Sequence, residues 1–301
     1  MRALVTGATG FIGRALVKRL DRPVVLSRDP VKARATLGPV DAFRWQPADA
    51  LPTLEALDGV DAVFHLAGEN VGAGRWTPAR KAAIRDSRVN GTGRLVRALS
   101  MLPQRPQVLV CASAVGYYGS RGDEVLDETK GPGRDFLAEV CQAWEAEAAV
   151  ARSFGMRVVH ARFGLVLGSG GGALAAMLPL FRAGVGGPFG LGGQWVPWVA
   201  VDDAVGMLLH AAATPALDGP MNVVGPAPVR NREFAHALGK AVHRPALLPV
   251  PGIALRLAVG EFAESLRASQ RVLPRAATAT GFLHACPDLA SALQAALHPG
   301  L

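Results

Sequence analysis

Three glycines near the amino terminus place the strongest constraint on how this 301-residue chain folds. Gly7, Gly10 and Gly13 follow an apolar stretch at residues 3–5 and precede a pattern typical of a helix. The first glycine permits a tight turn, the second lets a pyrophosphate approach the backbone, and the third lets the helix pack closely on the strand. The spacing therefore predicts a dinucleotide-binding turn at a helix amino terminus. The other residues of this turn that we expect at the cofactor are Thr9, Phe11 and Ile12.

Short apolar runs alternate with helical patterns over the first half of the chain, which is typical of a parallel sheet with crossover helices. We expect one helix to begin after Thr77, with Pro78 at its first position, and another to begin after Asp135 and end at Gly155. The expected strands are almost wholly apolar, as in a sheet buried on both faces. They lie at residues 3–5, 24–26, 62–66, 108–111 and 158–161. The predicted fold class is α/β, a doubly wound Rossmann sheet.

The alternation stops after residue 162. A glycine-rich passage at residues 184–193 is followed by a helix through 203–213, a strand at 221–224 and further helices to residue 297. We therefore place a Rossmann domain in residues 1–162 and a smaller, mainly helical substrate-binding lobe in residues 163–301.

The end of the second expected strand bears on the choice of dinucleotide. An acidic residue there would hold the ribose hydroxyls of NAD, whereas a hydroxyl followed by arginine suits a 2′-phosphate. This chain has Ser27 and Arg28, so the sequence favours NADP(H). The alternative is that Arg28 is solvated or paired with Asp29.

Composition and charge exclude several classes of protein. Hydrophobic residues make up 50% of the chain and charged residues 19%, as in ordinary globular proteins. The net charge is +8, but the arginines form no dense run, so we expect no nucleic-acid partner. Three scattered cysteines predict neither a disulfide framework nor a metal site, and fit the cytoplasm. We expect no secretory signal and no membrane span, because glycines and Pro179 interrupt the long uncharged stretch at 163–181.

Several motifs together resemble the extended short-chain dehydrogenase/reductase superfamily, namely TGATGFIG, FHLAGEN, SRVNGT and ASAVGYYG. More narrowly, the chain resembles the atypical, sugar-nucleotide-epimerase-like family along nearly its whole length, through LAGEN, GRWT, FLAEVCQAWE, WVPWVAVDDAV and NREFAHALGKAVHRP. The resemblance implies a bound NADP(H) and a carboxyl-terminal substrate lobe. It also implies that Leu66, Ala67 and Gly68 lie along the cofactor, and that a segment near residues 200–225 returns to the Rossmann domain.

The usual catalytic pair of the superfamily is missing from this chain. The superfamily places a serine, and a tyrosine with a lysine four residues later, around the reacting carbonyl or hydroxyl. Ser113 matches the serine. Aligning Glu145 with the superfamily's acidic residue puts Leu137 and Cys141 where the tyrosine and lysine belong.

Two other tyrosines are candidates to replace the missing acid/base pair. Tyr117 and Tyr118 follow Ser113 at the carboxyl end of an expected strand, where ligands bind in this architecture. The alternative is that the tyrosines pack beneath the second lobe. The loop after the cofactor segment holds further candidates, Glu69 and Trp76, for which local pairing or packing is the alternative.

These features predict an NADP(H)-binding, epimerase-like oxidoreductase that transfers hydride to or from a small-molecule substrate, with Ser113, Tyr117 and Tyr118 as catalytic residues. The alternative is a non-catalytic NADP(H)-binding sensor or scaffold, which the missing tyrosine and lysine favour. The sequence leaves the oligomeric state open, with a homodimer as one alternative.

Overall fold

Seven parallel strands form the central sheet of the protein, which a computed structural model describes over residues 1–246 and 248–298. Their order is β11-β7-β5-β4-β1-β2-β3, and every neighbouring pair is parallel. The strands are β1 (Ala3–Thr6), β2 (Val24–Ser27), β3 (Asp41–Arg44), β4 (Ala62–His65), β5 (Val108–Ala114), β7 (Arg157–Phe163) and β11 (Gly219–Val223). This arrangement confirms the predicted Rossmann fold class. Residues 247 and 299–301 of the predicted second lobe lie outside the described residues.

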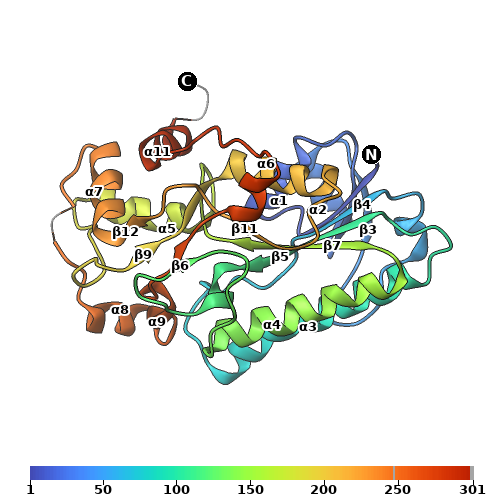
Figure 1. Ribbon diagram of the computed structural model, residues 1–301, viewed down its shortest axis with the longest axis horizontal. Coiled ribbons are helices and arrows are strands. Elements are labelled where there is room, and N and C mark those ends of the chain that lie inside the picture. Colours follow the sequence, from blue (N-terminus) through green and yellow to red (C-terminus); the bar gives the residue numbers. More distant parts are fainter. Residues whose placement is uncertain (247, 299–301) are drawn as a thin grey trace.

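Helices cover both faces of the sheet (Figure 1). On one face lie α1 (Phe11–Val17), α2 (Pro30–Leu37) and α6 (Val201–Ala213), and on the other lie α3 (Pro78–Ser100) and α4 (Phe136–Ala149). The Thr77 hydroxyl accepts the Arg80 N–H at the start of α3, and the Asp135 carboxylate accepts the Ala138 N–H at the start of α4. Both predicted helix starts are therefore confirmed. The second helix is an α-helix only as far as Ala149. A 3₁₀ turn, η3 (Val150–Phe154), then continues it to the predicted end at Gly155.

Some strands have no apolar run by which the sequence would reveal them. The edge strand β3 contains Asp41 and Arg44 and is partly exposed. Three further parallel or antiparallel pairs join strands of two or three residues, too short to predict from sequence pattern. They are β8 (Leu165–Leu167) with β10 (Trp198–Ala200), β9 (Trp195–Val196) with β12 (Val229–Arg230), and β6 (Val125–Leu126) with β13 (Arg271–Val272).

The second half of the chain is mainly helical but also contributes to the sheet. Its other helices are α5 (Gly172–Arg182), α7 (Asn231–Ala241), α8 (Gly252–Val259), α9 (Phe262–Leu266), α10 (Arg275–Ala279) and α11 (Leu289–Leu297). Trp198, Phe181 and Phe234 anchor the core of this lobe. The chain returns to the first half through α6, which packs on α1, and through β11, which pairs with β7. Among the described residues, no helix is both long and apolar enough to cross a bilayer.

A histidine lies inside the sheet between two hydroxyl groups. The ring nitrogens of His65 are 2.7 Å from the Thr6 hydroxyl and 2.9 Å from the Thr92 hydroxyl. Burial lowers the pKa of His65 from 6.5 to about 4, so the ring is neutral at pH 7. Burial likewise lowers the pKa of His160 to about 4. Both histidines are core residues.

This predicts a loss of stability in acid. Between pH 6.5 and 4 the unfolded chain gains a proton at His65 that the folded chain does not, so the free energy of unfolding decreases as the pH falls. Each such histidine adds a slope of up to about 1.4 kcal/mol per pH unit. Urea unfolding at pH 7, 6, 5 and 4.5 should show a shallower slope in His65→Gln than in the wild type. The surface variant His236→Gln should keep the wild-type slope, and equal slopes in all three proteins would contradict the prediction.

A candidate cofactor and substrate site

The glycine turn has the geometry of a phosphate cradle. Gly7 has φ 66°, and a Cβ there would lie 2.7 Å from the carbonyl carbon of Leu66. A Cβ on Gly13 would lie 2.3 Å from the Gly7 carbonyl oxygen. Only glycine fits both positions, so β1, the start of α1 and the loop after β4 approach one another as closely as a backbone phosphate site requires.

A cleft of about 620 Å³ opens beside this turn, at the carboxyl ends of β1, β2 and β4. The predicted residues Gly7, Thr9, Gly10, Arg28, Leu66, Ala67 and Gly68 all line it. Phe11 instead lies against the second lobe, since a Cβ on Gly171 would come within 3.0 Å of three atoms of its side chain. Ile12 packs against the core. The cleft walls that sequence reasoning missed are formed by Gln46, Pro47, Ala48, Ala83, Asp86, Ser87, Asn90 and Arg94. The SRVNGT motif pointed to the α3 wall; nothing in the sequence pointed to the loop after β3.

Among the residues that the structure describes, no carboxylate from the end of β2 lines this cleft. Ser27 and Arg28 line it, and Arg28 is exposed. The Asp29 carboxylate accepts the Lys32 N–H at 3.0 Å and so caps α2. The cation at the end of β2 therefore faces the cleft with the neighbouring acid engaged elsewhere.

A buried ion pair lies next to the cofactor end of the sheet. The Glu145 carboxylate on α4 accepts two hydrogen bonds from Arg162 on β7, from Nε and Nη2, each at 2.8 Å. The two side chains are 11% and 4% exposed. Burial acts to lower the pKa of Arg162, but the hydrogen bonds and charge of Glu145 outweigh it and raise the pKa. Arg162 therefore remains a fixed cation.

The predicted catalytic residues gather around this pair. The Ser113 hydroxyl donates to Glu145 at 2.7 Å. The Arg162 Nη1 donates at 3.0 Å to the Tyr118 hydroxyl, which donates at 2.7 Å to Asn222 on β11. The Arg162 guanidinium also lies 3.4 Å from the centre of the Tyr117 ring, a cation–π contact. One arginine thus contacts both tyrosines.

Exposure distinguishes the three candidates. Ser113 is 3% exposed and Tyr118 is fully buried. Burial raises the pKa of Tyr118 to about 12, and its hydroxyl already has one donor and one acceptor partner. Tyr117 is half-buried and so retains surface for a ligand.

The two positions that we align with the tyrosine and lysine of the superfamily hold Leu137 and Cys141. A Cβ on Gly116 would lie 3.3 Å from the Cβ of Leu137, so Leu137 packs on the turn η2 (Val115–Tyr118). The Cys141 thiol lies 3.8 Å from the Ala114 carbonyl oxygen. Burial raises the pKa of Cys141 to about 11, which keeps the thiol neutral at pH 7.

Of the two candidates after the cofactor loop, Glu69 pairs locally and Trp76 packs on residues that are distant in sequence. The Glu69 carboxylate accepts from Arg80 at 3.1 Å. The Trp76 ring lies between Phe136 and Phe262, with ring centres 5.2 and 5.4 Å away. This loop therefore joins the Rossmann half to α9 of the second lobe.

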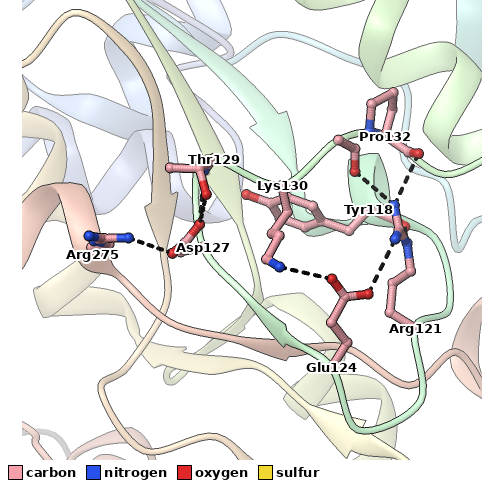
Figure 2. Close-up of polar contacts among 9 residues, drawn as sticks. Tyr118, Arg121, Glu124, Asp127, Thr129, Lys130, Pro132 and Arg275 are labelled. Atoms are coloured by element: carbon pink, nitrogen blue, oxygen red, sulfur yellow. Dashed lines mark hydrogen bonds and ion pairs between the residues drawn. The ribbon is translucent and has the colours of Figure 1, made fainter.

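The loop after Tyr118 is tied down by charge (Figure 2). Arg121 donates to the carbonyl oxygens of Gly131 and Pro132, and Glu124 pairs with both Arg121 and Lys130. Asp127 accepts from Arg275 at 2.9 Å, which connects the loop to α10. These contacts hold the tyrosine turn between the two halves of the protein.

Because the Glu145–Arg162 pair is buried, removing the charge of Glu145 should strongly lower the free energy of unfolding. Glu145→Gln keeps the shape of the side chain but leaves the Arg162 charge buried without its counter-charge. We expect a loss of about 3–5 kcal/mol in the free energy of unfolding, measured by urea denaturation. The matched variant Glu139→Gln, exposed on the same helix, should lose less than about 1 kcal/mol. Similar losses in the two variants would show that the buried pair is no more important than a surface charge.

Comparisons with known proteins agree with this architecture. Residues 3–225 match the model of the NAD dependent epimerase/dehydratase family, and residues 250–296 match a domain of unknown function. An epimerase family protein of Mycobacterium tuberculosis is 41% identical over 284 residues, covering 92% of this chain and 91% of the relative.

Two solved structures extend the likeness. The crystal structure of human epimerase family protein SDR39U1 with NADPH has a TM-score of 0.87 and 35% identity, covering 98% of this chain and 99% of the human chain. A nucleoside-diphosphate sugar epimerase from Corynebacterium glutamicum has a TM-score of 0.73 and 32% identity, covering 99% of this chain and 58% of that one. The chain belongs to the NAD dependent epimerase/dehydratase family.

Proposed function

We propose that the protein binds NADP(H) and transfers hydride between the cofactor and a small oxygenated substrate, as an epimerase-like oxidoreductase. The observation that carries the proposal is the cleft that joins the Gly7–Gly13 turn to Ser27 and Arg28. The NADPH in the structure of the human relative supports the choice of cofactor.

Each part of the cleft has a role in this proposal. The N–H groups at the start of α1 hold the diphosphate, and the Arg28 guanidinium pairs with the 2′-phosphate. The backbone at residues 66–68 lies along the dinucleotide. When bound, NADP(H) supplies or accepts a hydride at its nicotinamide ring. The chain's own residues must then orient the substrate and move the proton.

We assign proton transfer to Tyr117 and positioning to Ser113 and Tyr118. Tyr117 is the most exposed of the three and lies on the Arg162 guanidinium, which fixes its ring. Ser113 holds Glu145, and Tyr118 connects Arg162 to Asn222. The two buried hydroxyls therefore set the position of the guanidinium that supports Tyr117.

A nucleoside-diphosphate sugar is the substrate class that we propose. The name of the C. glutamicum relative supports it. The indole ring of Trp195 also lies 4.1 Å from the Arg230 guanidinium and 4.7 Å from that of Arg271. Guanidinium groups match phosphate oxygens in charge and geometry, so Arg271 in this group suits a phosphate, while Arg230 already pairs with the Asp123 carboxylate at 2.8 Å.

A non-catalytic NADP(H)-binding sensor is the second candidate function. The apolar Leu137 and the neutral Cys141 thiol, in place of the usual tyrosine and lysine, favour it. A sensor would bind NADPH and NADP with different affinities and turn over no substrate.

Replacing Arg28 tests the cofactor. The purified protein should bind NADPH at least about 10-fold more tightly than NADH, because a charge-assisted contact to the 2′-phosphate contributes about 1.5–3 kcal/mol. Arg28→Ala should remove this preference in fluorescence titrations. Lys18→Ala, an exposed cation at the end of α1, should keep it. Equal affinities of the wild type for NADPH and NADH would refute the assignment of Arg28.

Replacing Tyr117 tests the chemistry. NADPH oxidation is measured across a panel of carbonyl compounds and 4-keto sugar nucleotides. Tyr117→Phe should lower kcat by about 10²–10³-fold, as expected for loss of an acid/base group, with the dissociation constant for NADPH unchanged. Wild-type turnover that survives in Tyr117→Phe would overturn its role. NADPH binding without turnover of any compound would favour the sensor.

A further inference from the structure

We infer that Arg88 on α3 supplies the cofactor-binding cation that α4 lacks at Cys141, and that its guanidinium donates to the ribose next to the nicotinamide of NADP(H). This inference rests on the proposed function, because it concerns the same cofactor.

The guanidinium of Arg88 lies against the cofactor loop. A Cβ on Gly68 would be 3.1 Å from its Cζ atom and 3.3 Å from Nη2. Gly68 lines the cleft, as do Ser87 and Asn90, which lie one residue before and two residues after Arg88 in the sequence. The charged end of Arg88 therefore touches the loop that runs along the cofactor.

The same guanidinium packs on α4. Its Cζ atom is 5.1 Å from the centre of the Trp144 ring. Trp144 follows Cys141 by three residues, so both side chains lie on one face of α4. The Arg88 charge opposes the effect of burial on the pKa of the Cys141 thiol, as expected for a cation near that sulfur. Arg88 thus places its charge beside the position that carries lysine in the superfamily.

The guanidinium also has donors to spare. Within residues 1–246 and 248–298 it makes one hydrogen bond, from Nη1 to the Ile84 carbonyl oxygen at 3.0 Å. An arginine has five N–H donors, so four remain. The nearby Glu69 carboxylate hydrogen-bonds to Arg80, and its charge also opposes the effect of burial on the pKa of Arg88. A half-buried cation with one carbonyl partner is costly, and a ligand with several hydroxyl acceptors would offset that cost.

Ribose hydroxyls fit these donors better than a second phosphate does. The diphosphate already has the N–H groups of the Gly7–Gly13 turn, which line the same cleft. Gly68 and α4 lie toward the end of β5, where Ser113 and Tyr117 are, and that is the substrate end of the proposed site. A cation here holds the reactive end of the cofactor rather than its adenine end.

The experiment compares two ligands that differ at that end. Binding of NADPH and of adenosine 2′,5′-diphosphate, which lacks the nicotinamide, its ribose and the phosphate attached to that ribose, is measured by calorimetry. Arg88→Gln should weaken NADPH binding about 10-fold or more and leave adenosine 2′,5′-diphosphate binding within about 2-fold, because a charge-assisted hydrogen bond is lost with one ligand only. Arg28→Ala should weaken both ligands. Arg97→Gln, an exposed charge change on the same helix, should weaken neither.

The conservative variant Arg88→Lys should bind NADPH with an affinity between those of the wild type and Arg88→Gln, because it keeps the charge with fewer donors. Unchanged adenosine 2′,5′-diphosphate binding also shows that the variants are folded. Equal loss for both ligands, no loss for either, or no advantage of Arg88→Lys over Arg88→Gln would overturn the inference. If the wild type binds neither ligand, the proposed function itself fails.

Discussion

The bidentate pair between Glu145 and Arg162 holds together the parts of the protein that meet at the site. It connects α4 to β7, and through Tyr118 and Asn222 it reaches β11 at the edge of the sheet. The Asn222 amide in turn donates to the Leu273 carbonyl oxygen in the second lobe. Burying two charges costs several kcal/mol per ion, and the pair is tolerated because its geometry is bidentate and Ser113 and Tyr118 satisfy further hydrogen-bonding atoms. Its main effect is to define one arrangement of these elements.

Main-chain atoms form the glycine turn, whereas side chains form the group at the end of β5. At the glycine turn, backbone atoms form the site, and side chains are excluded because a Cβ on Gly7 or Gly13 would collide with main-chain atoms. At the end of β5, the charged side chains of Glu145 and Arg162, from α4 and β7, surround Ser113 and the two tyrosines. A backbone cradle accepts any dinucleotide phosphate, whereas side chains set which substrate and which reaction are possible. The glycine turn therefore tolerates little change.

Sequence reasoning succeeded where the cause of a structure is local. The helix starts at Thr77 and Asp135 depend on a side chain and an N–H three residues away, and the glycine turn depends on residues within one motif. The resemblance to an epimerase-like family is confirmed, and the NADP(H) expectation agrees with the NADPH bound by the human relative. The boundary at residue 162 and the catalytic roles stay predictions.

Sequence reasoning failed where the partners lie far apart in the chain. Arg162 follows a strand expected to be apolar, and nothing near it shows that a carboxylate 17 residues earlier faces it from a helix. Trp76 packs on Phe262, which is far away in sequence. The edge strand β3 was missed because an edge tolerates the polar Asp41 and Arg44, so the apolar pattern of a buried strand is absent.

A cation can lie at the same place in a fold without coming from the same sequence motif, as the missing lysine illustrates. In the superfamily the cation near the nicotinamide is on the helix that here carries Cys141. In this protein that helix keeps the carboxylate Glu145 but has no lysine, and the guanidinium groups come from β7 and α3, through Arg162 and Arg88. Guanidinium groups remain charged even when buried, whereas a lysine there would lose part of its charge to desolvation. Positive charge thus reaches the end of β5 from β7 and from α3, although the helix that usually carries the lysine has none there.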